Sequence, residues 1–131
     1  MNRSTKRVKD WRMLSEHEIQ SYIENTKKIL ENIFGGLSLV FCALIDFNTG
    51  LDVLIRGTSE ELKEYKAQAK ILSRRNLEKI EYLALDGLEG VTIYYNLKNW
   101  ERVLVLRHPW KRIIPIIISL VRESRQQLSI I

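Results

Sequence analysis

The segment from residue 37 to residue 57, LSLVFCALIDFNTGLDVLIRG, constrains the fold more than any other part of the chain. It predicts two strands, 37–47 and 51–56, joined by a tight turn at Asn48-Thr49-Gly50. The first strand carries apolar side chains on both of its faces. Such a strand belongs in the middle of a sheet that is covered on both sides. We therefore expect a layered fold with helices above and below a sheet.

Length and composition describe one globular domain. The chain has 131 residues, of which 45% are hydrophobic and 28% are charged. The single Cys42 excludes an internal disulfide and favours a reducing compartment. The longest mostly apolar run, residues 113–121, is far shorter than the roughly 20 residues that span a bilayer. No stretch resembles a signal peptide, so we expect a cytoplasmic protein.

The positive charge is concentrated in residues 1–14. The net charge of the whole chain is +5, and five Lys or Arg against Asp10 give this segment +4. We expect residues 1–14 to form a mobile basic arm and residues 15–131 to form a single domain. The arm is either a solvated terminus or a segment that attracts the phosphates of nucleic acid or anionic lipid.

Two capping boxes mark the starts of helices. Ser15-Glu16-His17-Glu18 predicts a helix over 15–34, and Gly35-Gly36 is expected to end it in the left-handed conformation. Thr58-Ser59-Glu60-Glu61 predicts a second helix that continues to about residue 76. A third, apolar helix reaches about residue 128. It starts near either Pro109 or Pro115.

Three short strands separate the second and third helices, at 80–85, 91–95 and 102–107. The strand at 102–107 is apolar on both faces, like 37–47, so these two are expected to be central and adjacent. We therefore predict an α+β fold, a three-layer α/β/α sandwich around a five-stranded antiparallel sheet of order 2-1-5-4-3. The element order is αββαβββα.

The two edges of this predicted sheet differ. The edge strand 51–56 carries Asp52 and Arg56, charges that discourage pairing with another chain. The edge strand 80–85 has little protection beyond Glu81, which favours extension of the sheet across a two-fold axis. We predict a homodimer, or a heterodimer with a similar chain, paired through Ile80, Glu81, Tyr82, Leu83, Ala84 and Leu85.

Over residues 15–130 the chain resembles the Roadblock family, which includes a class of dynein light chains. The hairpin FCALIDFNTGLDVLIRG is similar to that family's strand–turn–glycine–strand signature, and the acidic helix start Ser59-Glu60-Glu61 follows it as usual. The connection Asn96–Trp100 is similar to the family's asparagine-containing loop. The chain departs from the pattern in the bulky Leu54-Ile55-Arg56 and in its basic arm.

The resemblance implies a Roadblock/profilin-like fold and a dimer with a continuous sheet, in which the second helix of each subunit lies beside the two-fold axis. Family members are non-enzymatic scaffolds and regulators of Ras-like small GTPases, sometimes as parts of larger assemblies, and do not bind nucleotide themselves. The basic residues of the second helix are then candidate partner contacts, or else a solvated face: Lys63, Lys66, Lys70, Arg74 and Arg75.

The residues offer little chemistry for catalysis. The sequence has no phosphate-binding GxxxxGK[ST] motif and too few Cys and His residues for a structural zinc site. We therefore expect no enzyme activity, no cofactor and no metal. Cys42 is interpreted as an inert buried thiol, and His17 as a surface residue. His108 is either a loop histidine or a sensor of pH or anions.

A basic and aromatic cluster lies before the last helix. Arg107, Trp110, Lys111 and Arg112, with Lys98 and Arg102 upstream, predict a positive patch for an acidic protein, phosphate or nucleic acid, or a solvated helix start. The last helix itself is apolar almost all round. It either packs against helix 15–34 or exposes a patch for a partner.

Two other functions remain open from the sequence. A small-ligand sensor of the PAS or GAF kind uses a similar sheet, and it requires a cavity between sheet and helices. The bulky Phe41, Phe47, Leu54 and Ile55 are expected to fill that space. Nucleic-acid binding through the arm 1–14 and the cluster at 107–112 predicts affinity that falls steeply with salt.

Overall fold

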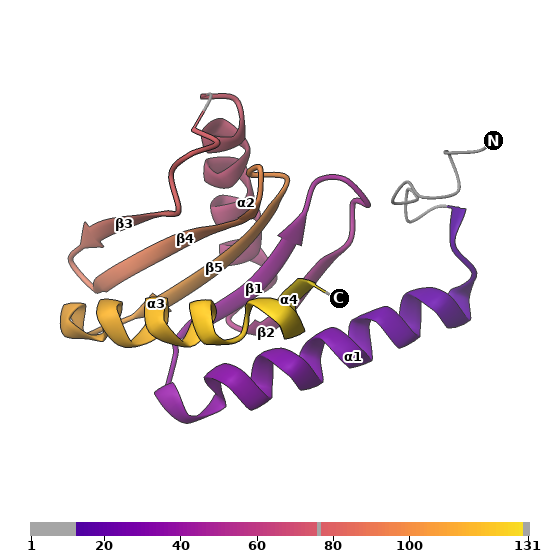
Figure 1. Cartoon of the computed structure of the whole chain (residues 1–131), viewed down its shortest axis with the longest axis horizontal. Coiled ribbons are helices and arrows are strands. Elements are labelled where there is room, and N and C mark those ends of the chain that lie inside the picture. The colour runs from indigo at the N-terminus through magenta and orange to yellow at the C-terminus, as the bar shows by residue number, and fades with distance from the viewer. Residues whose placement is uncertain (1–12, 76, 130–131) are drawn as a thin grey trace.

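The structure is a computed structural model that describes residues 13–75 and 77–129. Its centre is a five-stranded antiparallel sheet of order β2-β1-β5-β4-β3, which confirms the predicted topology (Figure 1). The strands are β1 (Phe41–Asp46), β2 (Asp52–Arg56), β3 (Tyr82–Gly87), β4 (Gly90–Lys98) and β5 (Arg102–His108). The helices are α1 (Glu16–Phe34), α2 (Ser59–Ser73), α3 (Ile114–Glu123) and α4 (Arg125–Ser129).

Helices cover both faces of the sheet, as the two-sided apolar strands required. One core lies between the sheet and α1, α3 and α4, and it includes Leu30, Leu44 and Leu104. A second core lies under α2 and includes Phe41 and Trp100. All six residues of β1 are buried, because this strand contributes to both cores.

Helix α1 begins at the predicted capping box and ends at Phe34 as predicted, but the cap that follows is not the predicted left-handed glycine. The Ser15 hydroxyl accepts from Glu18 N–H at 3.1 Å, and the Glu18 carboxylate accepts from Ser15 N–H at 2.9 Å. Gly35 stays right-handed with φ −58°, in a 3₁₀ turn Gly35–Leu37, and Ser38 takes the left-handed conformation with φ 54°. This turn brings the Leu37 carbonyl within 3.0 Å of the His108 Nε2 atom.

Helix α2 begins at its predicted capping box, with Thr58 as the N-cap, and ends at Ser73, before the expected residue 76. Its Ala69 is fully buried, and the half-buried Leu62, Tyr65 and Leu72 pack around it. Gly57, which precedes the cap, has φ +111° and lies close to the Phe41 ring.

The last helical segment begins at Ile114 with Pro115 in its first turn, after a 3₁₀ turn at Lys111–Ile113. Of the two prolines, Pro115 therefore marks the start. Helix α3 packs on α1 as well as on the sheet, and this contact accounts for its apolar excess. Ile116 remains 46% exposed.

Candidate protein-interaction surface

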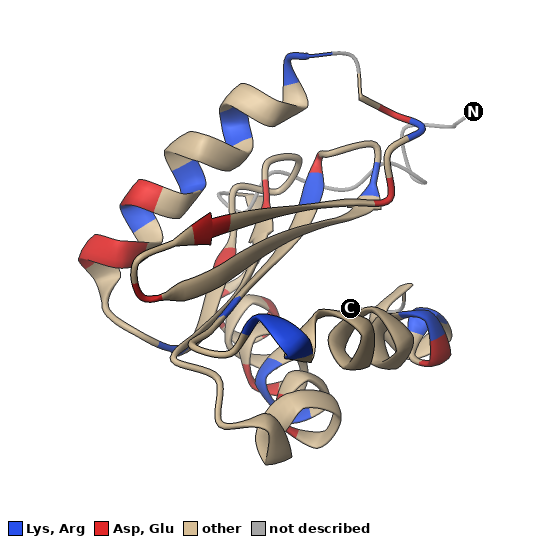
Figure 2. Cartoon of the chain, turned by 90° about the vertical axis from the view of Figure 1, so that its left-hand side faces the viewer, with Lys and Arg blue, Asp and Glu red and all other residues tan. Residues whose placement is uncertain are grey.

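The outer side of β3 is an open edge of the sheet, and Figure 2 looks onto it. β3 pairs with β4 on one side, and among the described residues no strand of the sheet lies beyond it. Ala84, Leu85, Asp86 and Gly87 are exposed, and Leu85 keeps 49% of its surface in contact with solvent. Leu88, in the turn that follows, is fully exposed. Apolar side chains and unpaired backbone groups thus occur together on this edge.

The opposite edge, β2, is better protected. Helix α1 lies against β2, and the two charged residues predicted to protect this strand are both engaged in ion pairs. Asp52 contacts Lys66 of α2 at 2.8 Å, and Arg56 contacts Glu31 of α1 at 3.5 Å. The contrast between the two edges singles out β3 as the side available to another chain.

The predicted pairing segment 80–85 is displaced by two residues in the structure, because Ile80 and Glu81 precede the strand. Asn96 holds this segment, since its Nδ2 donates to the Ile80 carbonyl at 3.1 Å and its N–H to the Glu81 carbonyl at 2.9 Å. Asn96 Oδ1 also accepts from Trp100 N–H at 2.7 Å. The predicted positions Tyr82, Leu83, Ala84 and Leu85 do lie in β3.

The Glu81 carboxylate is bound within the chain and does not guard the edge. Arg122 of α3 donates to both of its oxygens, at 2.8 and 2.6 Å, and the Tyr95 hydroxyl donates to it as well. These hydrogen bonds, first from Arg122 and then from Tyr95, lower the pKa of Glu81 to about 2. The start of β3 is thereby fastened to α3 and β4.

A shallow hollow of about 420 Å³ lies between α2 and the β3–β4 hairpin. Tyr65 of α2, Leu85 of β3 and Tyr94 of β4 line it, together with the hairpin turn at 87–90. Burial raises the pKa of Tyr94 to about 12, so its hydroxyl stays protonated at physiological pH. The hollow continues the apolar edge onto the α2 face of the sheet.

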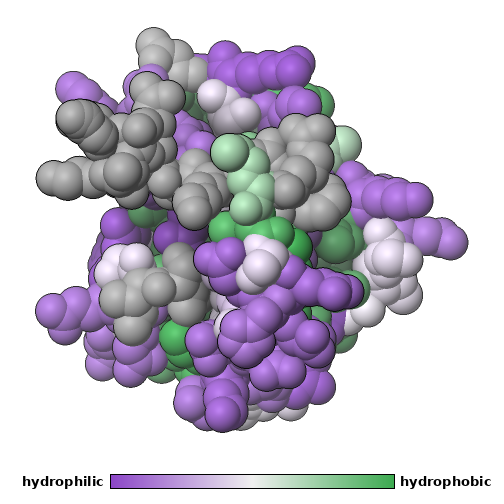
Figure 3. Space-filling model, turned by 90° about the vertical axis from the view of Figure 1, so that its right-hand side faces the viewer, coloured by the Kyte–Doolittle hydropathy of each residue, from purple (hydrophilic) through white to green (hydrophobic). Residues whose placement is uncertain are grey.

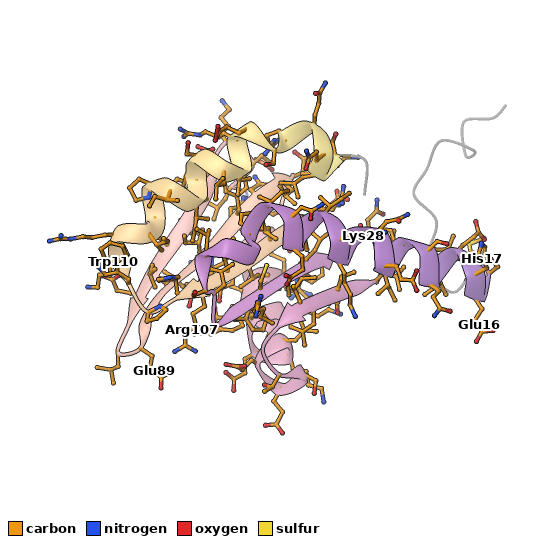
Figure 4. All side chains as sticks on the ribbon, turned by 90° about the horizontal axis from the view of Figure 1, so that it is seen from below. Glu16, His17, Lys28, Glu89, Arg107 and Trp110 are labelled. Carbon is orange, nitrogen blue, oxygen red and sulfur yellow. The ribbon has the colours of Figure 1, made fainter. Side chains whose placement is uncertain are left out.

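Arg107 lies at the side of this hollow and is engaged by three neighbours. It donates to the Tyr65 hydroxyl at 3.1 Å, forms an ion pair with Glu89, and has Glu61 at 3.8 Å (Figure 4). The hydrogen bond to Glu89 raises its pKa further, although burial opposes this. Only 18% of its side chain is exposed. The arrangement makes Arg107 a link between α2, β5 and the hairpin rather than a free cation.

The rest of the predicted positive patch is also divided. Lys111 contacts Asp86 of β3 at 3.0 Å, whereas Trp110 is 53% exposed and Arg112 is exposed. Arg102 lies at the opposite end of β5 from Arg107, and Lys98 pairs with it across the sheet. Strand β5 therefore separates the residues that the sequence grouped together.

His108 has a structural role. Its Nδ1 accepts from the Trp110 N–H at 2.9 Å, which assigns the proton to Nε2 and makes that nitrogen the donor to the Leu37 carbonyl. His17 lies exposed at the far end of α1 (Figure 4). Cys42 is 1% exposed, and burial raises the pKa of its thiol to about 12.

The charges of α2 are divided between its two sides. Tyr65 lines the hollow near β3, while Lys66 contacts Asp52 of β2. Because an α-helix has about 3.6 residues per turn, Lys63, Lys70 and Arg74 lie on the same β2 side as Lys66. The β3 side carries a row of residues that we call the α2 stripe: Glu64, Gln68, Ile71 and Arg75. All four of these residues are exposed, and Ile71 is 45% exposed.

Bulky side chains fill the two cores. Phe41 is fully buried, Phe47 and Leu54 pack beside it under α2, and Ile55 packs on the α1 side. Among residues 13–75 and 77–129, no group of three or more His, Cys, Asp or Glu is placed to hold a metal ion. Within the same part of the chain, no helix is both long and apolar enough to cross a membrane. Residues 1–12 of the predicted basic arm 1–14 lie outside the described residues.

Comparisons with models of protein families, with curated proteins and with solved structures found no significant match.

Proposed function

We propose that this protein is a non-enzymatic, dimeric scaffold or regulator that recognises a partner protein through its surface. The observation that carries the proposal is the open β3 edge, which places Leu85 and Leu88 in solvent beside unpaired backbone groups. A second copy of the same edge supplies both an apolar contact and the missing backbone hydrogen bonds.

The pairing follows from the geometry of β3. Two antiparallel β3 strands related by a two-fold axis perpendicular to the sheet keep both α2 helices on the same face. Pairing centred on Ala84 sets Leu83 beside Leu85 of the partner subunit, on the α2 side where Leu83 already packs. It also sets Leu88 beside Ile80 of the partner subunit.

The α2 stripe suits this arrangement. The stripe begins at Glu64 and ends at Arg75, with Gln68 and Ile71 between them. Two copies run antiparallel beside the axis, so each acidic end meets the basic end of the other. The stripe is therefore complementary to itself in charge and apolar near its middle, as an interface between identical subunits requires.

The partner class is drawn from the resemblance to the Roadblock family. We propose a Ras-like small GTPase, bound on the composite face that the two α2 helices form. Lys63, Lys70 and Arg74 lie on the β2 sides of these helices, away from the axis, where they are accessible to an acidic surface. The dimer acts on the GTPase by positioning its switch loops.

Dimerisation is tested by sedimentation of the wild-type chain and of Leu85→Lys. Burying a lysine in the paired edge is expected to weaken dimerisation at least tenfold. Val40→Lys is the matched control, because Val40 is 47% exposed and precedes β1. A wild-type chain that sediments as a monomer at high concentration contradicts the dimer.

GTPase recognition is tested separately, by binding purified small GTPases from the same organism in each nucleotide state. Lys63→Glu and Lys70→Glu are expected to weaken binding without changing the oligomeric state. A stable dimer that binds no GTPase in any nucleotide state refutes this part of the proposal and leaves the dimer standing.

A further inference from the structure

A second pocket, of about 300 Å³, lies at the other end of β5, far from the hollow beside the hairpin. It is formed by the end of β4, the start of β5 and helix α4. Figure 3 shows the face of the molecule near the end of α4. We call it the α4 pocket, and its lining residues are Leu97, Lys98, Arg102, Arg125, Leu128 and Ser129.

The charge of this lining is one-sided. Three of its six residues are cations, and none is an acid. Asp46 lies beside the lining, with its Oδ2 atom 3.5 Å from Arg102 Nε. Asp46 Oδ1 is already occupied, because it accepts from Asn48 N–H at 2.9 Å and from Thr49 N–H at 3.1 Å in the β1–β2 turn. Among the described residues, Asp46 pairs with Arg102 and Glu81 acts electrostatically on Arg125, so positive charge still exceeds negative charge at the pocket.

Arg102 has buried donors that make no well-formed hydrogen bond. Only 13% of its side chain is exposed, yet its Nε and Nη2 atoms are buried and make no hydrogen bond with the described residues. Buried guanidinium donors are normally satisfied, because leaving them unpaired costs free energy. An acceptor brought by a ligand would remove this cost.

Two buried hydroxyls accompany the guanidinium group. The hydroxyls of Tyr22 and Thr26, on the α1 helix, are buried and make no well-formed hydrogen bond with the described residues, although Tyr22 interacts with both Thr26 and Arg102. Burial raises the pKa of Tyr22, and the charge of Arg102 opposes the rise. Buried polar groups thus gather at this end of the sheet.

The other two cations are positioned at the pocket and remain accessible. Arg125 lies over the Tyr95 ring at 5.9 Å and donates to the Leu97 carbonyl at 3.4 Å. Lys98 is exposed at the end of β4. Arginine recognises phosphate through paired N–H donors, and lysine adds a point charge.

We propose that the α4 pocket binds a phosphate group carried by a small organic molecule, with Arg102 and Arg125 as its hydrogen-bond donors and Lys98 at its mouth. A dianion suits this excess of positive charge better than a singly charged carboxylate. The side chains of Leu97 and Leu128 leave an apolar wall for the organic part of the ligand.

The experiment is a titration of the full chain, followed by NMR of backbone amides and by calorimetry at constant ionic strength. The probes are inorganic phosphate, glycerol phosphate and acetate. We expect saturable binding of the two phosphates, with shifts confined to the residues around the pocket, and at least tenfold weaker binding of acetate. Stronger binding of glycerol phosphate than of inorganic phosphate supports contact between the organic part of the ligand and the apolar wall. Equal binding of the two contradicts that contact and leaves only recognition of the phosphate group.

Variants locate the site. Arg125→Gln and Lys98→Gln, both at exposed residues, are expected to weaken phosphate binding about tenfold each while leaving the far-UV circular dichroism unchanged. Lys70→Gln and Arg74→Gln on α2 are the matched controls and are expected to bind as the wild type does. Absence of saturable binding, or equal loss in the pocket and control variants, overturns the proposal.

Discussion

The indole Nε1 of Trp100 donates a hydrogen bond of 2.7 Å to the backbone carbonyl of Leu77. Trp100 is 1% exposed and has a left-handed backbone with φ 59°, so its position is set by the β4–β5 turn. Leu77 lies in the connection between α2 and β3. This hydrogen bond therefore fastens the connection that leads into β3 to the β4–β5 turn.

Asn96 is the residue whose loss is expected to loosen this connection most. Asn96→Ala removes its bonds to Trp100 N–H and to the Ile80 carbonyl, and leaves both groups unpaired. We expect a loss of about 2–3 kcal/mol in the free energy of unfolding, measured with urea. The exposed Asn32→Ala on α1 is the control, with an expected change within about 0.5 kcal/mol. Equal effects of the two substitutions contradict the assigned role.

Acid is expected to weaken the Glu81–Arg122 pair in a defined range. The pKa of Glu81 falls from 4.5 to about 2 on folding, so its contribution is complete above pH 4.5 and is lost as the pH falls towards 2. Because the Glu81 side chain is 34% exposed, solvent screening keeps this contribution small. Unfolding of wild type and Glu81→Gln, followed against pH, should differ most above pH 4.5 and converge near pH 2.

Gly90 is expected to tolerate no side chain. Its φ is +120°, and a Cβ atom would lie 2.2 Å from the His108 carbonyl oxygen, which is backbone of the neighbouring strand. Gly90→Ala should lower the free energy of unfolding by about 3 kcal/mol or more, through strain and overlap. Gly36→Ala, where a Cβ meets nothing within 4 Å, should be close to neutral. Thermal unfolding of the two variants tests the difference.

Exchange of charges along the α2 stripe tests the orientation of the proposed dimer. Glu64→Arg and Arg75→Glu are each expected to weaken dimerisation severalfold, because like charges then meet across the axis. The two substitutions together should recover most of the loss. Recovery in sedimentation experiments supports antiparallel α2 helices, and additive losses contradict this orientation.

Single cysteines along β3 give the register of the proposed pairing. In an antiparallel pair, the residue nearest the two-fold axis forms the fastest disulfide with its own copy. We expect the maximum at Ala84→Cys, and little cross-linking of Gln20→Cys, an exposed control on α1. Cys42 should not interfere, because burial raises its thiol pKa to about 12. A flat profile along the strand contradicts edge pairing.

The strand order was predictable because it depends on local patterns and simple burial rules. The apolar faces of β1 and β5 place these strands at the centre, and the capping boxes at Ser15 and Thr58 locate two helices. The end of α1 at Phe34 was predicted, but the left-handed conformation predicted for Gly35-Gly36 was wrong. The 3₁₀ turn after α1 is tied to His108, more than 70 residues away along the chain, and no local pattern records such a contact.

The candidate site was predicted less completely. The unprotected edge was visible in the sequence, but the start of β3 depends on Asn96, which is 16 residues from Ile80. Arg107 and Arg102 looked equivalent as basic residues of one segment. In the structure they lie at opposite ends of strand β5, with Arg107 beside Glu89 and Arg102 beside Asp46. Ion pairs between distant segments leave no periodic signal.

The unequal edges of the sheet limit how far assembly can proceed. A sheet with two free edges can add copies at both and grow into a fibre. Here α1 lies against β2, and Asp52 and Arg56 are held by Lys66 and Glu31. In the proposed dimer, pairing through β3 would use the open edge of both copies and leave the β2 edges outermost. Growth of the sheet would then stop at two chains, because α1 and the two ion pairs hinder addition at β2.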